Sequence, residues 1–360
     1  MKPTNDIDAA EQTQETTEEP TVVSRADLAK AHETAEKLVK QLADVPDGDL
    51  VGRIITNSLK LLRDQTNRGD IKLINKSFEE MRYALKIFAP YRDVRKVSIF
   101  GSARTLESHE DYRRASAFGK AMAEAGWMVI TGAGAGIMAA GHGGGGAAAS
   151  FGLAIRLPFE QQTNTFIAND PKLVNFKYFF TRKLMFVRFS HAIALFPGGF
   201  GTMDEGFEVL TLVQTGKSVP MPIVFIDSPG SGYWKSWQDY VENQLLSRGL
   251  IGKADLSLYT ITTDIEQAVQ HIRHFYSNYH SVRYTRDKLV MRLHKAPTPA
   301  QLAEINREFA DISRDGFKAR SALPIERNEK AIADLPRLVF DFNRRDHGRL
   351  RMLIDHLNDL

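Results

Sequence analysis

Short apolar runs alternate with amphipathic segments through the middle of the chain. Six runs predict strands, at residues 97–100, 128–130, 153–157, 192–196, 223–226 and 258–261. Apolar residues at three- and four-residue steps predict helices between them, for example at 112–125, 178–190 and 202–215. Uninterrupted apolar strands that alternate with helices are typical of a parallel sheet covered on both faces. We therefore predict an α/β fold with a Rossmann-like, doubly wound parallel sheet.

Both ends of the chain depart from this alternation. Residues 1–22 are acidic and polar and predict a disordered tail. Residues 23–92 show three helical patterns, which predict a helical extension that packs on the core or on a second subunit. The alternating core occupies residues 93–280. Residues 281–360 predict a small α+β module in the order β-α-β-β-α.

Composition narrows the possible classes of function. With 360 residues, 43% of them hydrophobic, the chain can build a full core. A net charge of +3 gives no polyanion signature, so we expect no nucleic-acid polymer as a partner. The lack of cysteine excludes thiolate metal sites and cysteine nucleophiles and fits the cytoplasm. No apolar run has membrane-spanning length, so we expect no membrane partner.

The most informative motif is the segment 197–205, Pro-Gly-Gly-Phe-Gly-Thr-Met-Asp-Glu, which directly follows an apolar run. Glycines allow close approach of a ligand to the backbone, and the N–H groups at a helix start suit a phosphate. A carboxylate, Glu205, follows one turn into the helix. An alternative is a capping box formed by Thr202 and Glu205, and both interpretations can hold at once. We predict phosphate binding here by Gly198, Gly199, Gly201 and Thr202.

Two further glycine-rich turns follow predicted strands. Gly101 and Ser102 end the first strand, although Gly-Ser after a strand is commonly just a turn. Gly132, Gly134 and Gly136 follow the second strand and open a helix. They formally fit a dinucleotide fingerprint, but no acidic residue ends the next strand, which disfavours a dehydrogenase. Since ligands bind at the carboxyl ends of parallel strands, all five residues are candidate contacts of a nucleotide.

Three further side chains are charged or titratable and are considered as residues of a functional site. Arg182 precedes the Pro-Gly-Gly strand on a predicted helix, and its guanidinium can clamp a phosphate or balance a carboxylate. The neighbouring Lys183 is expected at the surface. His142 lies among glycines without histidine or carboxylate partners at metal spacing, so we expect an incidental role and no metal.

Together these segments resemble the LONELY GUY (LOG) family, long mislabelled as lysine decarboxylases. The family signature P-G-G-x-G-T-x-x-E matches residues 197–205, and an Arg-Lys pair matches Arg182 and Lys183, with the arginine 23 residues before the glutamate. The turns at residues 101–102 and 132–138 match as well. The segments 157–161 and 214–217 look like the longer bacterial branch. The resemblance covers roughly residues 95–275.

This resemblance implies hydrolysis of the N-glycosidic bond of a nucleoside 5′-monophosphate, giving free base and ribose 5-phosphate. It assigns Glu205 and Arg182 as the catalytic residues and requires no cofactor. Glu205 would stabilise the oxocarbenium charge on C1′ or activate water, since a carboxylate suits both roles. The family also implies a homodimer or larger assembly. A cytokinin riboside monophosphate is one possible substrate, and the base preference stays open.

Two other functions remain as alternatives. A nucleotide sensor or carrier would use the same pocket without releasing base. Amino-acid decarboxylation, as the old label suggests, needs a lysine that holds pyridoxal phosphate, and no residue pattern here indicates one.

Overall fold

The computed structural model describes residues 24–42, 44–156, 163–326 and 329–360, except for the side chains of Arg25 and Leu28. It contains two compact units, Met1–Phe78 and Glu79–Leu360, which we describe separately. The predicted acidic tail at 1–22 and the motif at 157–161 lie outside the described residues.

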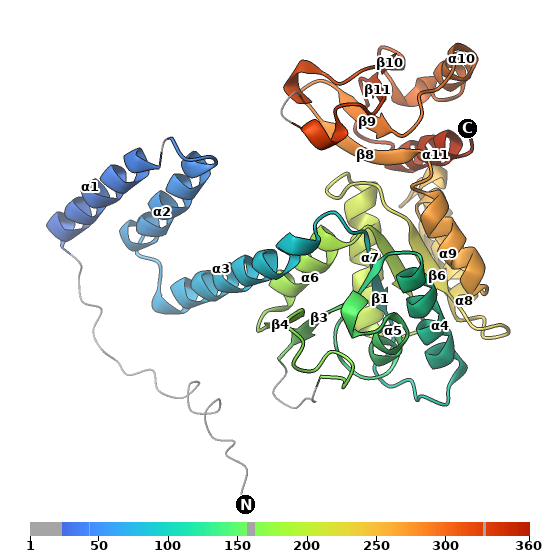
Figure 1. Cartoon of the computed structure of the whole chain (residues 1–360), viewed down its shortest axis with the longest axis horizontal. Helices are drawn as coiled ribbons and strands as arrows, with labels where there is room; N and C mark the ends of the chain where they lie inside the picture. Colours follow the sequence, from blue (N-terminus) through green and yellow to red (C-terminus); the bar gives the residue numbers. More distant parts are fainter. Residues whose placement is uncertain (1–23, 43, 157–162, 327–328) are drawn as a thin grey trace, which may run out of the picture. The chain divides into compact units, whose positions relative to one another are not determined.

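A seven-stranded sheet forms the centre of the second unit, in the order β4-β3-β2-β1-β5-β6-β7 (Figure 1). Every neighbouring pair of these strands is parallel. This confirms the predicted α/β fold with a Rossmann-like parallel sheet. The strands are β1 (Lys96–Phe100), β2 (Met128–Thr131), β3 (Ser150–Ile155), β4 (Leu173–Phe176), β5 (Ala192–Leu195), β6 (Ile223–Ile226) and β7 (Thr260–Thr262).

Helices cover both faces of this sheet, because each face carries its own hydrophobic core. One core contains Phe118 of α4 (Glu110–Glu124), Ile137 of α5 (Ile137–Gly145) and Ile272 of α9 (Ile265–His274). The other core holds side chains from four helices: α3 (Arg68–Phe88), α6 (Phe179–Phe189), α7 (Phe200–Gln214) and α8 (Tyr233–Tyr240). The structure thus has the doubly wound arrangement that the alternation predicted.

One strand of the sheet, β4, is missing from the sequence interpretation. Its residues alternate between the two faces, and only Val174 and Phe176 are buried. β4 lies at the edge of the sheet and pairs with β3 alone. An edge strand does not need the uninterrupted apolar run by which the central strands were found.

The glycine-rich helix α5 packs unusually close to α4. A Cβ atom on Gly144 would lie 1.8 Å from the carbonyl oxygen of Ser116, and one on Gly119 would lie 2.5 Å from that of Gly141. Only glycine permits this approach of the two backbones, so the glycines of α5 keep a packing role apart from any ligand.

The C-terminal module contains a second sheet, in the order β10-β11-β9-β8, with antiparallel pairing throughout. Its strand β8 (Tyr279–Tyr284) was not predicted, so the element order is β-β-α-β-β-α rather than β-α-β-β-α. β8 was missed because it contains polar residues and therefore does not form an apolar run. The remaining elements are β9 (Leu289–Leu293), α10 (Pro299–Glu308), β10 (Lys318–Arg320), β11 (Arg337–Phe340) and α11 (His347–Asn358).

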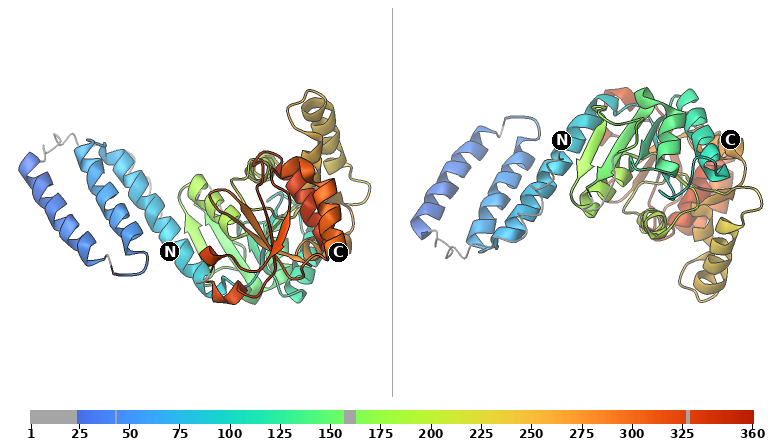
Figure 2. Two further views of the ribbon diagram at one scale, coloured as in Figure 1. Left: turned by 90° about the horizontal axis from the view of Figure 1, so that it is seen from above. Right: turned by 90° about the horizontal axis from the view of Figure 1, so that it is seen from below.

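The first unit consists of α1 (Arg25–Gln41), α2 (Gly48–Arg63) and the first part of α3. α1 and α2 lie side by side as a helical hairpin (Figure 2). Across the described residues of both units, no helix combines the length and the apolar character needed to cross a membrane.

Candidate functional site

Three glycine-rich loops meet at the carboxyl edge of the sheet. Strands β2, β3 and β4 follow one another on one side of β1, and β5 lies on the other side of β1. β1 and β5 therefore flank the point where the strand order reverses, which is where open α/β sheets bind ligands. Gly101 and Ser102 follow β1, and the Pro-Gly-Gly segment follows β5.

Main-chain hydrogen bonds join these loops. The N–H of Ser102 donates to the carbonyl oxygen of Pro197 at 3.1 Å, and the N–H of Ile137 donates to that of Ser102 at 3.0 Å. Gly136 has a φ of +62°, and a Cβ atom there would lie 2.2 Å from the Ser102 oxygen. A Cβ atom on Gly198 would lie 2.2 Å from Oγ1 of Thr202. Both positions therefore require glycine.

The other predicted glycines fall into two groups. A Cβ atom on Gly101, Gly132 or Gly134 would approach side chains of α5 to 2.7 Å, so these glycines face protein. Gly199 and Gly201 instead have no atom of the described residues within 4 Å of such a Cβ. The Pro-Gly-Gly turn thus leaves the start of α7 accessible to a ligand.

The start of α7 contradicts the capping-box alternative. The N-cap residue is Gly199, so Thr202 lies inside the first turn and not at the cap. The N–H groups of Thr202 and Met203 donate to the Gly199 oxygen at 3.0 and 3.1 Å. Within the described chain, the N–H groups of Phe200 and Gly201 have no acceptor, as expected for a helix start that binds an anion. Glu205 is therefore not a capping residue.

Glu205 is buried, with 5% of its surface exposed. Its Oε1 atom lies 4.0 Å from Nη2 of Arg182, and Oε2 has no hydrogen-bond partner among the described residues. Burial raises the pKa of Glu205 to about 7, against the opposing effect of the cations Lys183 and Arg182. Asp204 and Glu208 raise the pKa further. A carboxyl group in this environment can exchange a proton near neutral pH.

Arg182 extends from α6 toward Glu205 and the loop after β2. Its guanidinium lies over the ring of Phe179, at 5.1 Å from the centroid. A Cβ atom on Gly132 would lie 3.7 Å from its Nη1 atom. The structure therefore places Arg182 beside both Glu205 and the loop after β2. It brings together the two residues that the sequence assigned to catalysis, and their roles remain a proposal.

The expectation that Lys183 lies at the surface is wrong. Its side chain is 16% exposed, and its Nζ atom forms ion pairs with Asp204 at 2.5 Å and Glu208 at 2.7 Å. Sequence spacing could not show that α6 and α7 bring these groups together. Although it pairs with these two carboxylates, Lys183 lowers the pKa of Glu205 more than Arg182 does.

Two residues near the loops were missed by the sequence interpretation. The hydroxyl of Tyr233 donates to the carbonyl oxygen of Gly198. Nδ2 of Asn164 donates to the oxygen of Gly134 at 2.9 Å. Both side chains fix loop carbonyl groups from distant parts of the chain, and no local motif marks them.

His142 lies on α5 and is fully buried, with its side chain against β3. Its Nε2 atom lies 3.0 Å from the carbonyl oxygen of Phe151, to which Nε2–H donates, and Nδ1 lies 3.2 Å from Nδ2 of Asn164. Burial lowers the pKa of His142, so the ring is neutral and suited to donate at one nitrogen and accept at the other. These contacts give it a structural position behind the loop after β2.

The described residues at this edge of the sheet include no group of three side chains that could bind one metal ion. In the part of the chain that the structure describes, one such group is found, and it consists of Glu304, Glu308 and His356 in the C-terminal module.

The parallel sheet and its loops at the switch point define a Rossmann-like α/β domain. Residues 134–272 match the family model described as "Possible lysine decarboxylase". The match confirms the resemblance to the LOG family, for which this description is the historical label. No curated protein matches the chain.

Several solved structures resemble the chain at low sequence identity. TM1055, a structural genomics target, is 20% identical over 50% of this chain and 99% of that one, with a TM-score of 0.37. The molybdenum cofactor carrier protein of Chlamydomonas reinhardtii is 17% identical over 50% and 96%, with a TM-score of 0.36. DNA processing protein A of Streptococcus pneumoniae is 10% identical over 69% and 98%, with a TM-score of 0.34.

Proposed function

We propose that this protein is a nucleoside 5′-monophosphate phosphoribohydrolase. One observation carries the proposal: a buried carboxyl group, Glu205, lies one helical turn from the open N–H groups at the start of α7. An α-helix advances about 5.4 Å per turn. A ribose whose 5′-phosphate is bound at Phe200 and Gly201 can therefore present its other end to Glu205.

The reaction needs a group that stabilises positive charge on C1′. As the bond from C1′ to the base nitrogen breaks, its electron pair leaves with the base and an oxocarbenium-like sugar forms. The ionised carboxylate of Glu205 stabilises this charge and takes a proton from the attacking water, whose oxygen bonds to C1′. The departing base gains the proton. The products are free base and ribose 5-phosphate.

The neighbouring residues support this role. Arg182 favours the ionised form of Glu205 and offers donors to the substrate. Thr202 and the N–H groups of Phe200 and Gly201 would bind the phosphate, as would Ser102 across the switch point. A pKa near 7 lets Glu205 both accept and return a proton at neutral pH.

We extend the proposal to partners and location on the same basis. The substrate would be a free mononucleotide such as AMP or an N6-modified derivative, rather than a nucleic-acid polymer. The enzyme would act in the cytoplasm, to which the absence of cysteine is suited, and as a homodimer or larger assembly.

Incubation of the full chain with AMP, GMP, CMP and UMP tests the proposal, with chromatography of the products. We expect free base and ribose 5-phosphate in equal amounts from at least one nucleotide, and far slower reaction with the corresponding nucleoside. If nucleotides bind but no base is released, the protein is a sensor or carrier and the hydrolase proposal fails. An absorbance scan for a pyridoxal aldimine tests the decarboxylase alternative, which predicts a band that we do not expect.

A further inference from the structure

The helices of the first unit have no hydrophobic core of their own. Among the described residues of the segment 24–78, the buried ones are Gly48, Gly52 and Ser77, and none is a large apolar residue. Nine large apolar residues of this unit remain between 41% and 51% exposed: Leu38, Val45, Leu50, Val51, Ile54, Leu62, Leu73, Ile74 and Phe78.

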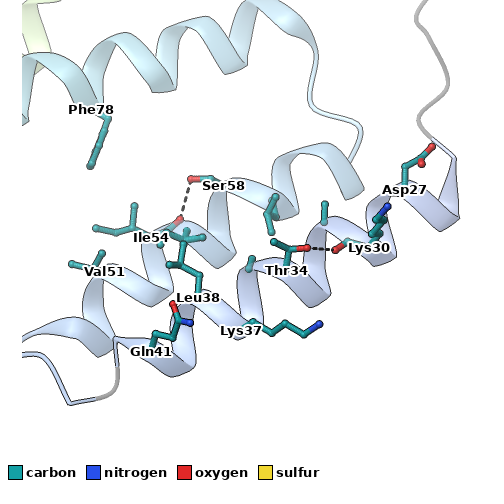
Figure 3. A pocket seen from close by; sticks show the side chains of 14 residues that line it. Asp27, Lys30, Thr34, Lys37, Leu38, Gln41, Val51, Ile54, Ser58 and Phe78 are labelled. Carbon is teal, nitrogen blue, oxygen red and sulfur yellow. Dashed lines mark hydrogen bonds between the residues drawn. The ribbon is translucent and has the colours of Figure 1, made fainter.

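Four of these nine residues, Leu38, Val51, Ile54 and Phe78, line an apolar groove between α1 and α2. The groove has a volume of about 1170 Å³ and is lined by Leu38 of α1 and by Val51, Ile54 and Ile55 of α2. Figure 3 shows Phe78 pointing from α3 toward the groove. The lining is mainly apolar, with charged side chains near the N-terminal end of α1.

Such an arrangement needs a partner to be stable. Helices of 16 and 17 residues are marginal in water, and in proteins their stability comes mostly from packing of an apolar face. α2 is strongly amphipathic in sequence, and yet Val51, Ile54 and Leu62 stay half exposed. The sequence left open whether this extension packs on the core or on a second subunit.

We propose that residues 24–78 form a dimerisation element, in which the α1–α2 hairpin packs against the hairpin of a second copy with the two α2 helices antiparallel. The charge of the element favours self-association. Residues 24–78 carry ten Lys and Arg side chains and eight Asp and Glu, so two copies repel each other little and a strongly charged partner has no matching surface.

The ends of α2 favour the antiparallel direction. Asp49 lies in its first turn, and Lys60 and Arg63 lie in its last turn. Antiparallel pairing brings the acidic end of one α2 near the basic end of the other and opposes the two helix dipoles. A two-fold axis produces this pairing with the same surface on both subunits.

The nine half-exposed apolar side chains mark this unit as an interaction surface, because monomeric proteins rarely expose contiguous apolar patches of more than a few hundred Å². This element also lies outside the segment 134–272 that matches the family model, so its interface is separate from any contact between the catalytic domains.

Cysteine cross-linking in the full chain tests the pairing, because the natural sequence contains no cysteine that would react. Ser58→Cys lies in the groove on α2, and Arg53→Cys lies on the same helix but outside the groove lining. With a short bis-maleimide, we expect covalent dimers from Ser58→Cys at least tenfold more than from Arg53→Cys. Equal yields from the two variants would overturn the proposal.

A second measurement uses the yield of the Ser58→Cys cross-link, which does not depend on any contact between the catalytic domains. Ile54→Glu in that background places a charge in the groove, and we expect it to lower the yield at least tenfold, with the circular dichroism of the full chain retained. Its matched control, Arg53→Glu, should keep the yield. If Ile54→Glu keeps the yield as well, the hairpin does not pair with a second copy, whether or not it binds a different protein.

Discussion

Glu205 and Glu326 are both buried glutamates of the second unit, and their surroundings differ sharply. In the C-terminal module, Oε1 of Glu326 accepts from Nε of Arg292 at 2.8 Å, and Oε2 accepts from Nε of Arg337 at 3.1 Å and from the N–H of Leu323 at 3.1 Å. At the carboxyl edge of the large sheet, Glu205 has Arg182 at 4.0 Å, and its Oε2 has no partner among the described residues.

The pKa values of the two carboxyl groups move in opposite directions. Burial acts to raise the pKa of Glu326, but hydrogen bonds from Leu323, Arg292 and Arg337 outweigh it and the pKa is lowered. Burial dominates at Glu205 and raises its pKa to about 7. A buried carboxylate with all its hydrogen bonds made stabilises the fold, whereas one left unsatisfied beside a ligand site is available for chemistry.

The largest expected effect is the loss of turnover in Glu205→Ala. Removing a group that transfers a proton and stabilises charge costs on the order of 10³-fold in kcat/KM. Steady-state release of base from the preferred nucleotide measures it. The matched variant Glu208→Ala, one turn further along α7, should retain activity within about tenfold, since its carboxylate pairs with Lys183. Near wild-type activity in Glu205→Ala would remove Glu205 from the mechanism.

Glu326→Gln should damage the fold and not the chemistry. The substitution leaves Arg337 buried without its anion and leaves Arg292 with Glu329 as its remaining anion, which costs about 3–5 kcal/mol of unfolding free energy. Chemical denaturation at pH 7.5 measures this loss. Glu205→Gln in the same experiment should be as stable as wild type or more so. Equal losses in the two variants would show that both glutamates are structural.

Arg182→Ala should reduce kcat/KM by about 10²-fold, less than the loss of Glu205, because it removes electrostatic support and not the reacting carboxylate. Its loss also raises the pKa of Glu205 further, since Arg182 favours the ionised form. The pH at which activity is half-maximal should therefore shift upward. An unchanged pH profile would mean that Arg182 does not act on Glu205.

The pH dependence of stability should separate the two glutamates. A carboxyl group with a raised pKa contributes its stability at low pH and loses it as the pH rises toward its folded pKa, here from about 4.5 to about 7. The unfolding free energy of Glu205→Gln relative to wild type should thus increase between pH 5 and pH 8, by up to roughly 3 kcal/mol. For Glu326 the sign is reversed, and its contribution is lost as the pH falls. A pH-independent difference for Glu205→Gln would contradict the raised pKa.

The smallest effect is expected from Tyr233→Phe. The hydroxyl of Tyr233 holds the carbonyl group of Gly198 in the loop before α7. Loss of one such hydrogen bond costs about 0.5–1.5 kcal/mol, so kcat/KM should fall by no more than about tenfold, mainly through KM. An effect as large as that of Arg182→Ala would indicate direct contact between Tyr233 and the substrate.

The sequence predicted the central strands and the loops because both have local signatures. Buried parallel strands are continuous apolar runs, and the Pro-Gly-Gly segment carries its glycines in a fixed order. β4 and β8 lack that signature, since one has a single buried face and the other carries polar residues. Lys183 and Asn164 could not be placed, because their partners lie on elements that only the tertiary fold brings near them.

The most direct test separates binding from chemistry in Glu205→Gln, which keeps the shape of the side chain and removes its charge. The preferred nucleotide is added to excess wild-type or variant protein, and bound nucleotide and free base are measured in a single turnover. We predict that the variant binds the nucleotide within a few fold of wild type and leaves its N-glycosidic bond intact. Release of base by Glu205→Gln at the wild-type rate would contradict the assignment of Glu205 as the catalytic carboxylate.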